Sequence, residues 1–234
     1  MTFFIDYLPT NLMHEFVIIV AGGSGSRMKS DIPKQFLPVN GLPILMHTIH
    51  AFSDYSTSLK IVLVLPESQF GYWEELCKTY KFGVSYRLVA GGETRFHSVK
   101  NGLDTIQEAS ALVAVHDGVR PIIQKSIIAS GFTKAGVSGT AVTSVALKDS
   151  IRKVKSDGSN TAKDRTRFQL IQTPQTFRID WMRTAFSKPY KTAFTDCASV
   201  LEAAGFGIHL IEGAYENIKI TTPEDLEWAK VYLK

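Results

Sequence analysis

A glycine-rich segment that carries two basic residues is the first part of the sequence that could do chemistry. Residues 21–35 read AGGSGSRMKSDIPKQ and follow the apolar run VIIV. Glycines allow backbone N–H groups to approach an anion, because no Cβ stands in the way. Arg27 and Lys34, seven residues apart, would add positive charge. The segment predicts a polyphosphate site, although a tight strand-to-helix turn would use the same glycines, Gly22, Gly23 and Gly25.

Two common phosphate-binding fingerprints do not fit this segment. A Walker loop needs Gly-Lys followed by Ser or Thr, and no such triplet follows Gly22. The dinucleotide fingerprint GxGxxG needs a third glycine where the sequence has Met28. A nicotinamide-dependent dehydrogenase is therefore disfavoured.

The elements around the loop predict an α/β fold. Short β-branched runs alternate with amphipathic segments, which is typical of βαβ units and a mostly parallel, twisted sheet with helices on both faces. The glycine loop would lie at the carboxyl edge of this sheet, where open α/β sheets bind ligands. The expected strands are 16–20, 60–65, 84–89, 112–116, 139–145 and 208–212, and the expected helices are 43–53, 69–80, 94–108, 126–135 and 197–204.

Residues 147–172 interrupt this alternation. Apolar and charged residues alternate on both sides of SDGSN, which predicts a β-hairpin with an Asp-Gly turn. An isolated hairpin is marginally stable, so we expect this protruding β-arm to pack against another element, such as a second subunit. A solvent-facing hairpin in a monomer would show the same alternation. We treat residues 1–234 as one domain with an extension of unassigned role at 1–14.

Composition excludes several classes of protein. The formal net charge is +4 and no run of five or six like charges occurs, so no nucleic-acid partner is expected. Apolar runs are far shorter than the roughly 20 residues that cross a bilayer. The amino-terminal segment lacks the features of a secretory signal, so we expect a cytoplasmic protein in which Cys77 and Cys197 are reduced thiols.

Several motifs resemble one known family. VAGGSGSRMKSDIPKQFLPVNGLPIL is similar to the GxGxRMxxxxPKQ signature of cytidylyltransferases that act on polyol phosphates. The motifs GGETRFHSV, VHDGVRP, TPQTF, TDCAS and ENIKITTPEDL follow in the family's order. The resemblance implies a Rossmann-like nucleotidyltransferase that uses CTP, a polyol phosphate and Mg²⁺, and a homodimer formed through the β-arm.

The resemblance also assigns roles to individual residues. Purely structural roles are the alternatives for three of these positions: Lys219 as the exposed end of a strand, Asp117 as a helix cap, and residues 91–98 as a simple βα turn. By resemblance, the catalytic residues are Arg27, Lys34 and Lys219; the nucleotide is bound by Ala21, Gly22, Gly23, Gly25, Gly91, Gly92, Glu93 and Ser98; the polyol phosphate is bound by Asp117, Arg120, Thr173 and Thr195, with Ser150 and Arg165 from a neighbouring subunit; and Asp117 also holds the metal.

The resemblance leaves a choice of acceptor substrate. The TDCAS helix favours members that act on a methylerythritol phosphate of the non-mevalonate isoprenoid pathway, and ribitol 5-phosphate is the alternative acceptor. A catalytically silent nucleotide-binding protein would have lost Arg27, Lys34 or Asp117, and all three are present. His116 is expected to pack in the core or behind the site rather than to act as a base.

Overall fold

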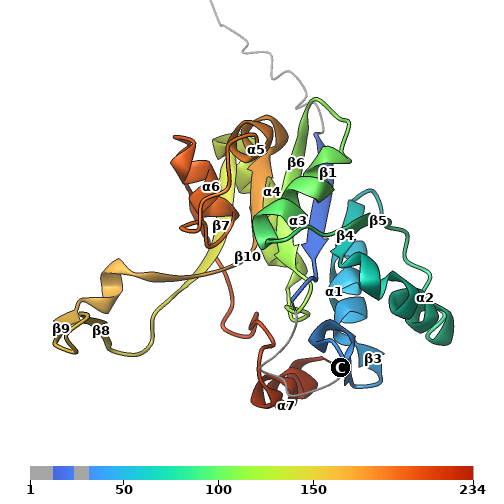
Figure 1. Ribbon diagram of the computed structural model, residues 1–234, viewed down its shortest axis with the longest axis horizontal. Coiled ribbons are helices and arrows are strands. Elements are labelled where there is room, and N and C mark those ends of the chain that lie inside the picture. The colour runs from blue at the N-terminus through green and yellow to red at the C-terminus, as the bar shows by residue number, and fades with distance from the viewer. Residues whose placement is uncertain (1–12, 24–31, 234) are drawn as a thin grey trace, which may run out of the picture.

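A seven-stranded sheet forms the centre of the protein (Figure 1). The computed structural model describes residues 13–23 and 32–233. The strands lie in the order β11-β7-β10-β6-β1-β4-β5. Their bounds are β1 His14–Val20, β4 Lys60–Leu65, β5 Arg87–Ala90, β6 Ala111–Asp117, β7 Thr140–Ala146, β10 Gln169–Arg178 and β11 Leu210–Glu212. The expected α/β sheet is confirmed, and its expected strands are present within a few residues.

Strand β10 is the part of the sheet that the sequence analysis missed. It runs antiparallel to both of its neighbours, β6 and β7, whereas the other pairs of adjacent strands are parallel. Pro174 argues against a central strand, because proline cannot donate to a neighbouring strand. Here the register to β7 shifts between Ile171 and Gln175, and this irregularity accommodates the proline. The expected β-arm therefore ends before β10 rather than at residue 172.

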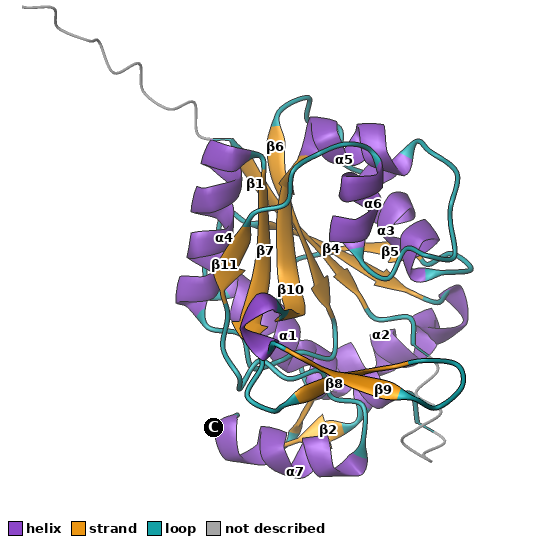
Figure 2. Cartoon of the chain, turned by 90° about the vertical axis from the view of Figure 1, so that its left-hand side faces the viewer, coloured by secondary structure: helices purple, strands orange, loops and turns teal. Residues whose placement is uncertain are grey.

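Two helical layers cover the two faces of the sheet (Figure 2). Side chains alternate along β1, so that Val17 and Ile19 face one core and Phe16 and Ile18 face the other. The first core contains residues of α1, α2 and α4, and the second contains residues of α3, α5 and α6. The bounds are α1 Ile44–Ser53, α2 Phe70–Thr79, α3 Arg95–Asp104, α4 Lys125–Ser138, α5 Ile179–Phe186 and α6 Cys197–Ala203.

The carboxyl-terminal segment returns to the glycine-loop end of the sheet. Helix α7, Pro223–Tyr232, packs through Ala229 against a small cluster with Val39, Ile44 and Val119. Ile220 belongs to the same cluster, and its N–H donates to the carbonyl of Val119 at 2.9 Å. This packing brings residues 217–220 beside the end of β6. Short elements complete this region: the 3₁₀ helices Lys34–Phe36 and Glu67–Gln69, and the two-residue strands β2 Pro38–Val39 and β3 Leu42–Pro43.

The expected hairpin projects from the body of the protein (Figures 1 and 2). Strands β8 Ile151–Val154 and β9 Asn160–Lys163 pair antiparallel around a turn that contains Gly158, whose φ is +82°. A 3₁₀ turn, Arg165–Arg167, follows β9. Nearly every residue of the hairpin is exposed. The hairpin is confirmed, whereas its use in dimerisation stays a prediction.

Cys77 and Cys197 are free cysteines, as expected. Within residues 13–23 and 32–233, none of the helices combines the length and the apolar character needed to cross a membrane.

Gly139 provides a test of the packing between α4 and α5. It ends α4 with φ of +79°, and a Cβ at this position would lie 2.4 Å from ring carbons of Trp181. We expect Gly139→Ala to lower the free energy of unfolding by roughly 2–4 kcal/mol, because both the backbone and the contact become strained. Urea unfolding followed by tryptophan fluorescence would measure the change.

Gly205 is the matched control for this substitution. Its φ is +93° and a Cβ would meet no atom within 4 Å. Gly205→Ala should therefore cost only the backbone part, about 1 kcal/mol. Equal losses in the two variants would contradict the assigned Trp181 contact.

Candidate active site

The carboxyl edge of the sheet carries a cavity of about 450 Å³. The ends of β1, β4, β5 and β6 meet there, as expected for parallel strands that end at one edge. The cavity is lined by most of the residues assigned from the sequence: Ala21, Gly22, Gly23, Lys34, Gly91, Gly92, Glu93, Ser98, Asp117 and Lys219. Arg27 and Gly25 lie outside the described residues. The structure therefore brings the described part of the assigned nucleotide and catalytic set to one place.

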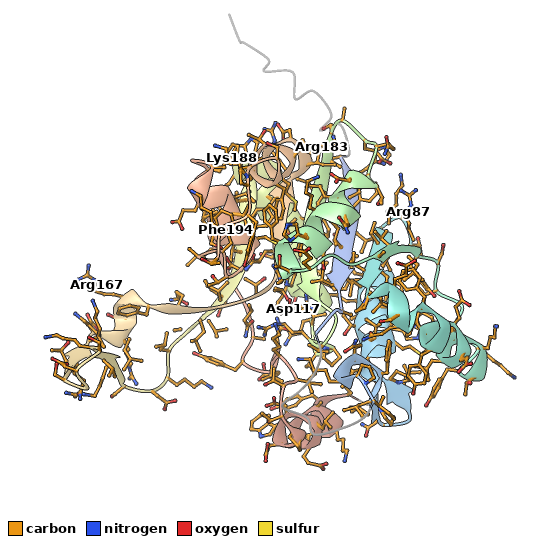
Figure 3. All side chains as sticks on the ribbon, viewed as in Figure 1. Arg87, Asp117, Arg167, Arg183, Lys188 and Phe194 are labelled. Carbon is orange, nitrogen blue, oxygen red and sulfur yellow. The ribbon has the colours of Figure 1, made fainter. Side chains whose placement is uncertain are left out.

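A second cavity of about 240 Å³ adjoins the first. The two share Arg95, Asp117 and Lys219 in their walls. The second cavity adds three further residues assigned from the sequence, Arg120, Thr173 and Thr195. Figure 3 shows Asp117 near the centre of the molecule. The site thus has two compartments that meet at one carboxylate and its cations.

Asp117 is the electrostatic centre of this junction. Its Oδ1 lies 3.4 Å from Arg95 Nε, and its Oδ2 lies 3.4 Å from Arg120 Nε and 3.0 Å from Lys219 Nζ. Burial alone would raise the pKa of Asp117, but the charges of Arg95, Lys219 and Arg120 outweigh burial and hold the pKa well below its ordinary value. One ionised carboxylate therefore faces three cations, and the surplus of positive charge suits an anionic ligand.

Lys34 reaches the cavity from the short helix after the glycine loop. Its side chain is buried, and Nζ donates to the carbonyl of Ile220 at 3.3 Å. A Cβ on Gly23 would lie 3.6 Å from Lys34 Cε, so the glycine lets the lysine pass close to the loop. Lys219, the neighbour of Ile220, lies in an irregular segment rather than at the strand end that the sequence suggested. The contact with Ile220 places the two lysines at the same cavity.

Gly91 and Gly92 form a close-packed corner between β5 and α3. The N–H of Gly92 donates to Ser98 Oγ at 3.1 Å, and the N–H of Gly91 donates to the carbonyl of Leu65 at 2.8 Å. A Cβ on Gly92 would lie 2.5 Å from His97 Cβ. Thr94 caps α3 by accepting from the N–H of His97. The turn from β5 to α3, which the sequence suggested as a structural alternative, therefore also forms the wall of the cavity at Gly91 and Gly92.

Arg95 and Asn217 contact residues of the assigned site, and the sequence analysis gave neither of them a role. Arg95 contacts Asp117 and donates through Nη1 to Cys197 Sγ at 3.2 Å. Burial raises the pKa of Cys197, which keeps it a neutral thiol. Asn217 is fully buried; its carbonyl accepts from Arg120 Nη1 at 2.7 Å and its Nδ2 donates to the carbonyl of Thr173 at 2.8 Å. Arg95 lies in the motif GGETRFHSV and Asn217 lies in ENIKITTPEDL, two residues before Lys219. Their positions inside these motifs were the signal that could have identified them.

The arm residues assigned to the substrate lie outside both cavities. Arg165 donates to the carbonyl of Lys148 within the arm and is exposed. Ser150 is exposed as well and lines neither compartment. In Figure 3, Arg167 marks the arm, far from Asp117. A single chain does not bring Ser150 and Arg165 to its own site.

The sequence matches a described family over nearly its whole length. The family model for 2-C-methyl-D-erythritol 4-phosphate cytidylyltransferase matches residues 15–234. A protein of that name from Phocaeicola vulgatus is 47% identical over 221 residues, which cover 94% of this chain and 100% of the relative. One from Porphyromonas gingivalis is 49% identical over 219 residues, covering 93% of this chain and 97% of the relative.

Solved structures show the same fold. The crystal structure of 4-diphosphocytidyl-2C-methyl-D-erythritol synthase from Anaerococcus prevotii superposes with a TM-score of 0.81 at 27% identity and covers 94% of this chain and 96% of that chain. The 2-C-methyl-D-erythritol 4-phosphate cytidylyltransferase from Francisella tularensis gives a TM-score of 0.79 at 31% identity, covering 94% of this chain and 100% of that chain.

Asp117→Asn tests the charge balance at the junction. The substitution keeps the shape of the side chain but leaves the three contacting cations without their carboxylate, so we expect a loss of roughly 3 kcal/mol in unfolding free energy at neutral pH. Thermal unfolding at low ionic strength would measure this loss. Added pyrophosphate should restore more stability to the variant than it adds to the unchanged protein, because the ligand replaces the missing negative charge. Equal stabilisation of both proteins would contradict this assignment.

Proposed function

Because the chain belongs to the 2-C-methyl-D-erythritol 4-phosphate cytidylyltransferase family, we propose that it joins CTP and 2-C-methyl-D-erythritol 4-phosphate. A phosphate oxygen of the polyol phosphate attacks the α-phosphorus of CTP, and the bond from that phosphorus to the bridging oxygen of the β-phosphate breaks. The products are 4-diphosphocytidyl-2-C-methyl-D-erythritol and pyrophosphate. The observation that carries this proposal is the junction at Asp117, where two cavities share three charged residues.

The two compartments suit the two substrates. The larger cavity has the glycine loop, Gly91, Gly92 and Ser98, whose compact main chain and hydroxyl can read the edge of a cytosine by hydrogen bonds. The smaller cavity has Arg120, Thr173 and Thr195, which can hold a polyol phosphate. The α-phosphorus would lie where the cavities meet.

Charge neutralisation is the main catalytic task. An incoming phosphate monoester is repelled by the triphosphate, so positioning and positive charge lower the barrier more than a protein nucleophile would. We assign Lys219 to the reacting phosphate because it lies at the junction, and Lys34 because it lines the larger cavity and contacts Ile220, the neighbour of Lys219. By resemblance, Arg27 holds the leaving pyrophosphate. Asp117 keeps the cations in place before the substrates arrive.

We also assign Mg²⁺ to Asp117. Among the described residues, no three His, Cys, Asp or Glu side chains gather into a ligand set. Mg²⁺ is often held by one or two carboxylates together with substrate phosphates, so a single aspartate fits an ion that arrives with the triphosphate. When bound, the ion would neutralise phosphate charge. Since three cations already contact Asp117, we expect little affinity for Mg²⁺ before CTP binds.

A homodimer through the arm completes the proposal. Ser150 and Arg165 lie away from the cavities of their own chain, which is the placement expected if they serve a neighbouring subunit. Apolar side chains at the arm, Val154, Phe168 and Leu170, are exposed and would be covered in a dimer. The cytoplasmic location expected from the sequence stays a prediction.

Lys34→Met tests the central catalytic assignment. Removing one charge that stabilises the transition state should lower kcat by on the order of 100-fold to 1000-fold while KM for CTP changes less. Pyrophosphate release from CTP with methylerythritol phosphate is the measurement, and ribitol 5-phosphate is the competing acceptor. Lys60→Met is the matched control, because Lys60 pairs with Glu108 and lines neither compartment of the site. A Lys34→Met enzyme within threefold of the unchanged protein would refute the assignment.

Mixing two inactive variants tests the arm. Lys34→Met and Arg165→Ala would each inactivate both sites of their own dimer. In a mixed dimer, the pocket with Lys34 would receive Arg165 from the other chain, so co-refolded variants should recover about a quarter of full activity, with half of the dimers mixed and one site complete in each. If Arg165 acts within its own chain, no activity returns on mixing.

A further inference from the structure

The hydroxyl of Thr173 has two protein partners, and together they fix its direction. Thr173 Oγ1 accepts from the N–H of Asp117 at 3.1 Å and lies 3.1 Å from Nδ1 of His116. A hydroxyl has one proton and two lone pairs. Its contact with His116 is therefore either a donation by the hydroxyl or a donation by the ring.

The other ring nitrogen of His116 decides between these two cases. His116 Nε2 lies 2.9 Å from the carbonyl oxygen of Arg120, which can only accept, so Nε2 carries a proton. The ring is fully buried and packs edge-on against Phe52, with 4.9 Å between centroids. A neutral imidazole has a single N–H, which Nε2 uses, and Nδ1 must then accept. Thr173 donates its only proton to His116.

This direction limits what Thr173 can offer a substrate. Thr173 lines the smaller cavity, and one lone pair of its Oγ1 has no partner from the hydrogen bonds described above. We infer that His116 makes Thr173 an acceptor-only group toward the polyol phosphate, so that Thr173 binds a hydroxyl of the polyol and does not donate to its phosphate. This inference rests on the proposed function, because the polyol phosphate is the ligand of that cavity.

His116 thereby acts as a positioning residue from behind the site. Through Nδ1 it orients the Thr173 hydroxyl, which in turn holds the main chain of Asp117. Through Nε2 it holds the carbonyl of Arg120, whose side chain contacts Asp117. Both of its ring nitrogens contact protein groups, so neither nitrogen faces the substrate directly.

Nitrogen NMR of the imidazole rings tests the hydrogen-bond direction without any turnover. The protein has six histidines, and the signal lost in His116→Gln identifies the ring. We expect the chemical shifts of a neutral ring protonated at Nε2. A ring protonated at Nδ1, or at both nitrogens, would overturn the inference.

Polyol phosphates that each lack one hydroxyl test the substrate contact. For the unchanged enzyme, kcat/KM should fall roughly 10-fold with the analogue that lacks the hydroxyl donating to Thr173. Thr173→Val should be about equally active on that analogue and on the complete substrate, because the acceptor is gone. Thr173→Ser keeps the hydroxyl and should retain the discrimination. If Thr173→Val discriminates against every analogue as the unchanged enzyme does, the inference is wrong.

Two substitutions of His116 separate positioning from bulk structure. His116→Asn can place an oxygen near the Nδ1 position and accept from Thr173, whereas His116→Gln places its amide nearer the Nε2 position. We expect His116→Asn to keep discrimination between the analogues and His116→Gln to lose it, with KM for CTP similar in both. A merely structural role predicts equal effects of the two substitutions on both substrates, and this result would overturn the positioning role.

The outcomes distinguish the two proposals. If the unchanged protein forms no cytidylyl product from CTP and methylerythritol phosphate, the proposed function fails, and the NMR result still decides the direction of the Thr173 hydrogen bond. If the unchanged protein forms the cytidylyl product and Thr173→Val still discriminates against every analogue as the unchanged protein does, only the further inference fails.

Discussion

The arrangement of the site depends on the carboxylate of Asp117 and the three cations on its oxygens. Arg95, Arg120 and Lys219 come from three different segments of the chain, and each would repel the others without the shared carboxylate. Because three cations surround one carboxylate, this edge of the sheet carries net positive charge before a ligand binds. In the proposed function, a triphosphate would take over part of the attraction that these cations now have for Asp117, so its charge would meet cations that are already in position.

The sheet explains how distant segments reach this carboxylate. Asp117 ends β6, whose N–H and carbonyl groups are held by β1 on one side and β10 on the other. The antiparallel β10 is useful because it brings Thr173 from the opposite chain direction to the same edge. The segment before α7 then closes the site, with Asn217 bonded to both Arg120 and Thr173. The end of β6 and the buried amide of Asn217 thus set the positions of Arg120 and Thr173, which we assign to the polyol phosphate.

Much of the site could be predicted from the sequence because its motifs have strong local requirements. Gly23, Lys34 and Asp117 lie at one cavity, as the resemblance of their motifs to the family implied. Arg95 was overlooked, since a lone arginine in a helix start gives no hint of a partner at Asp117, which lies 22 residues away. β10 was overlooked for a different reason: a proline in a polar run argues against a central strand, and only the pairing with β7 shows how the irregularity is tolerated.

The β-arm has features that packing within a single chain does not explain. Among the strands of the described residues, β8 and β9 pair only with each other, and a two-stranded ribbon of this kind gains little stability by itself. At its base, Leu170 and Ile171 are exposed although they belong to a strand whose later residues are buried. Ile171 also lines the smaller cavity, so the exposed apolar surface runs from the arm to the edge of the polyol compartment. If a partner covered this surface, as proposed above, it would support the arm and also reach the rim of the smaller cavity.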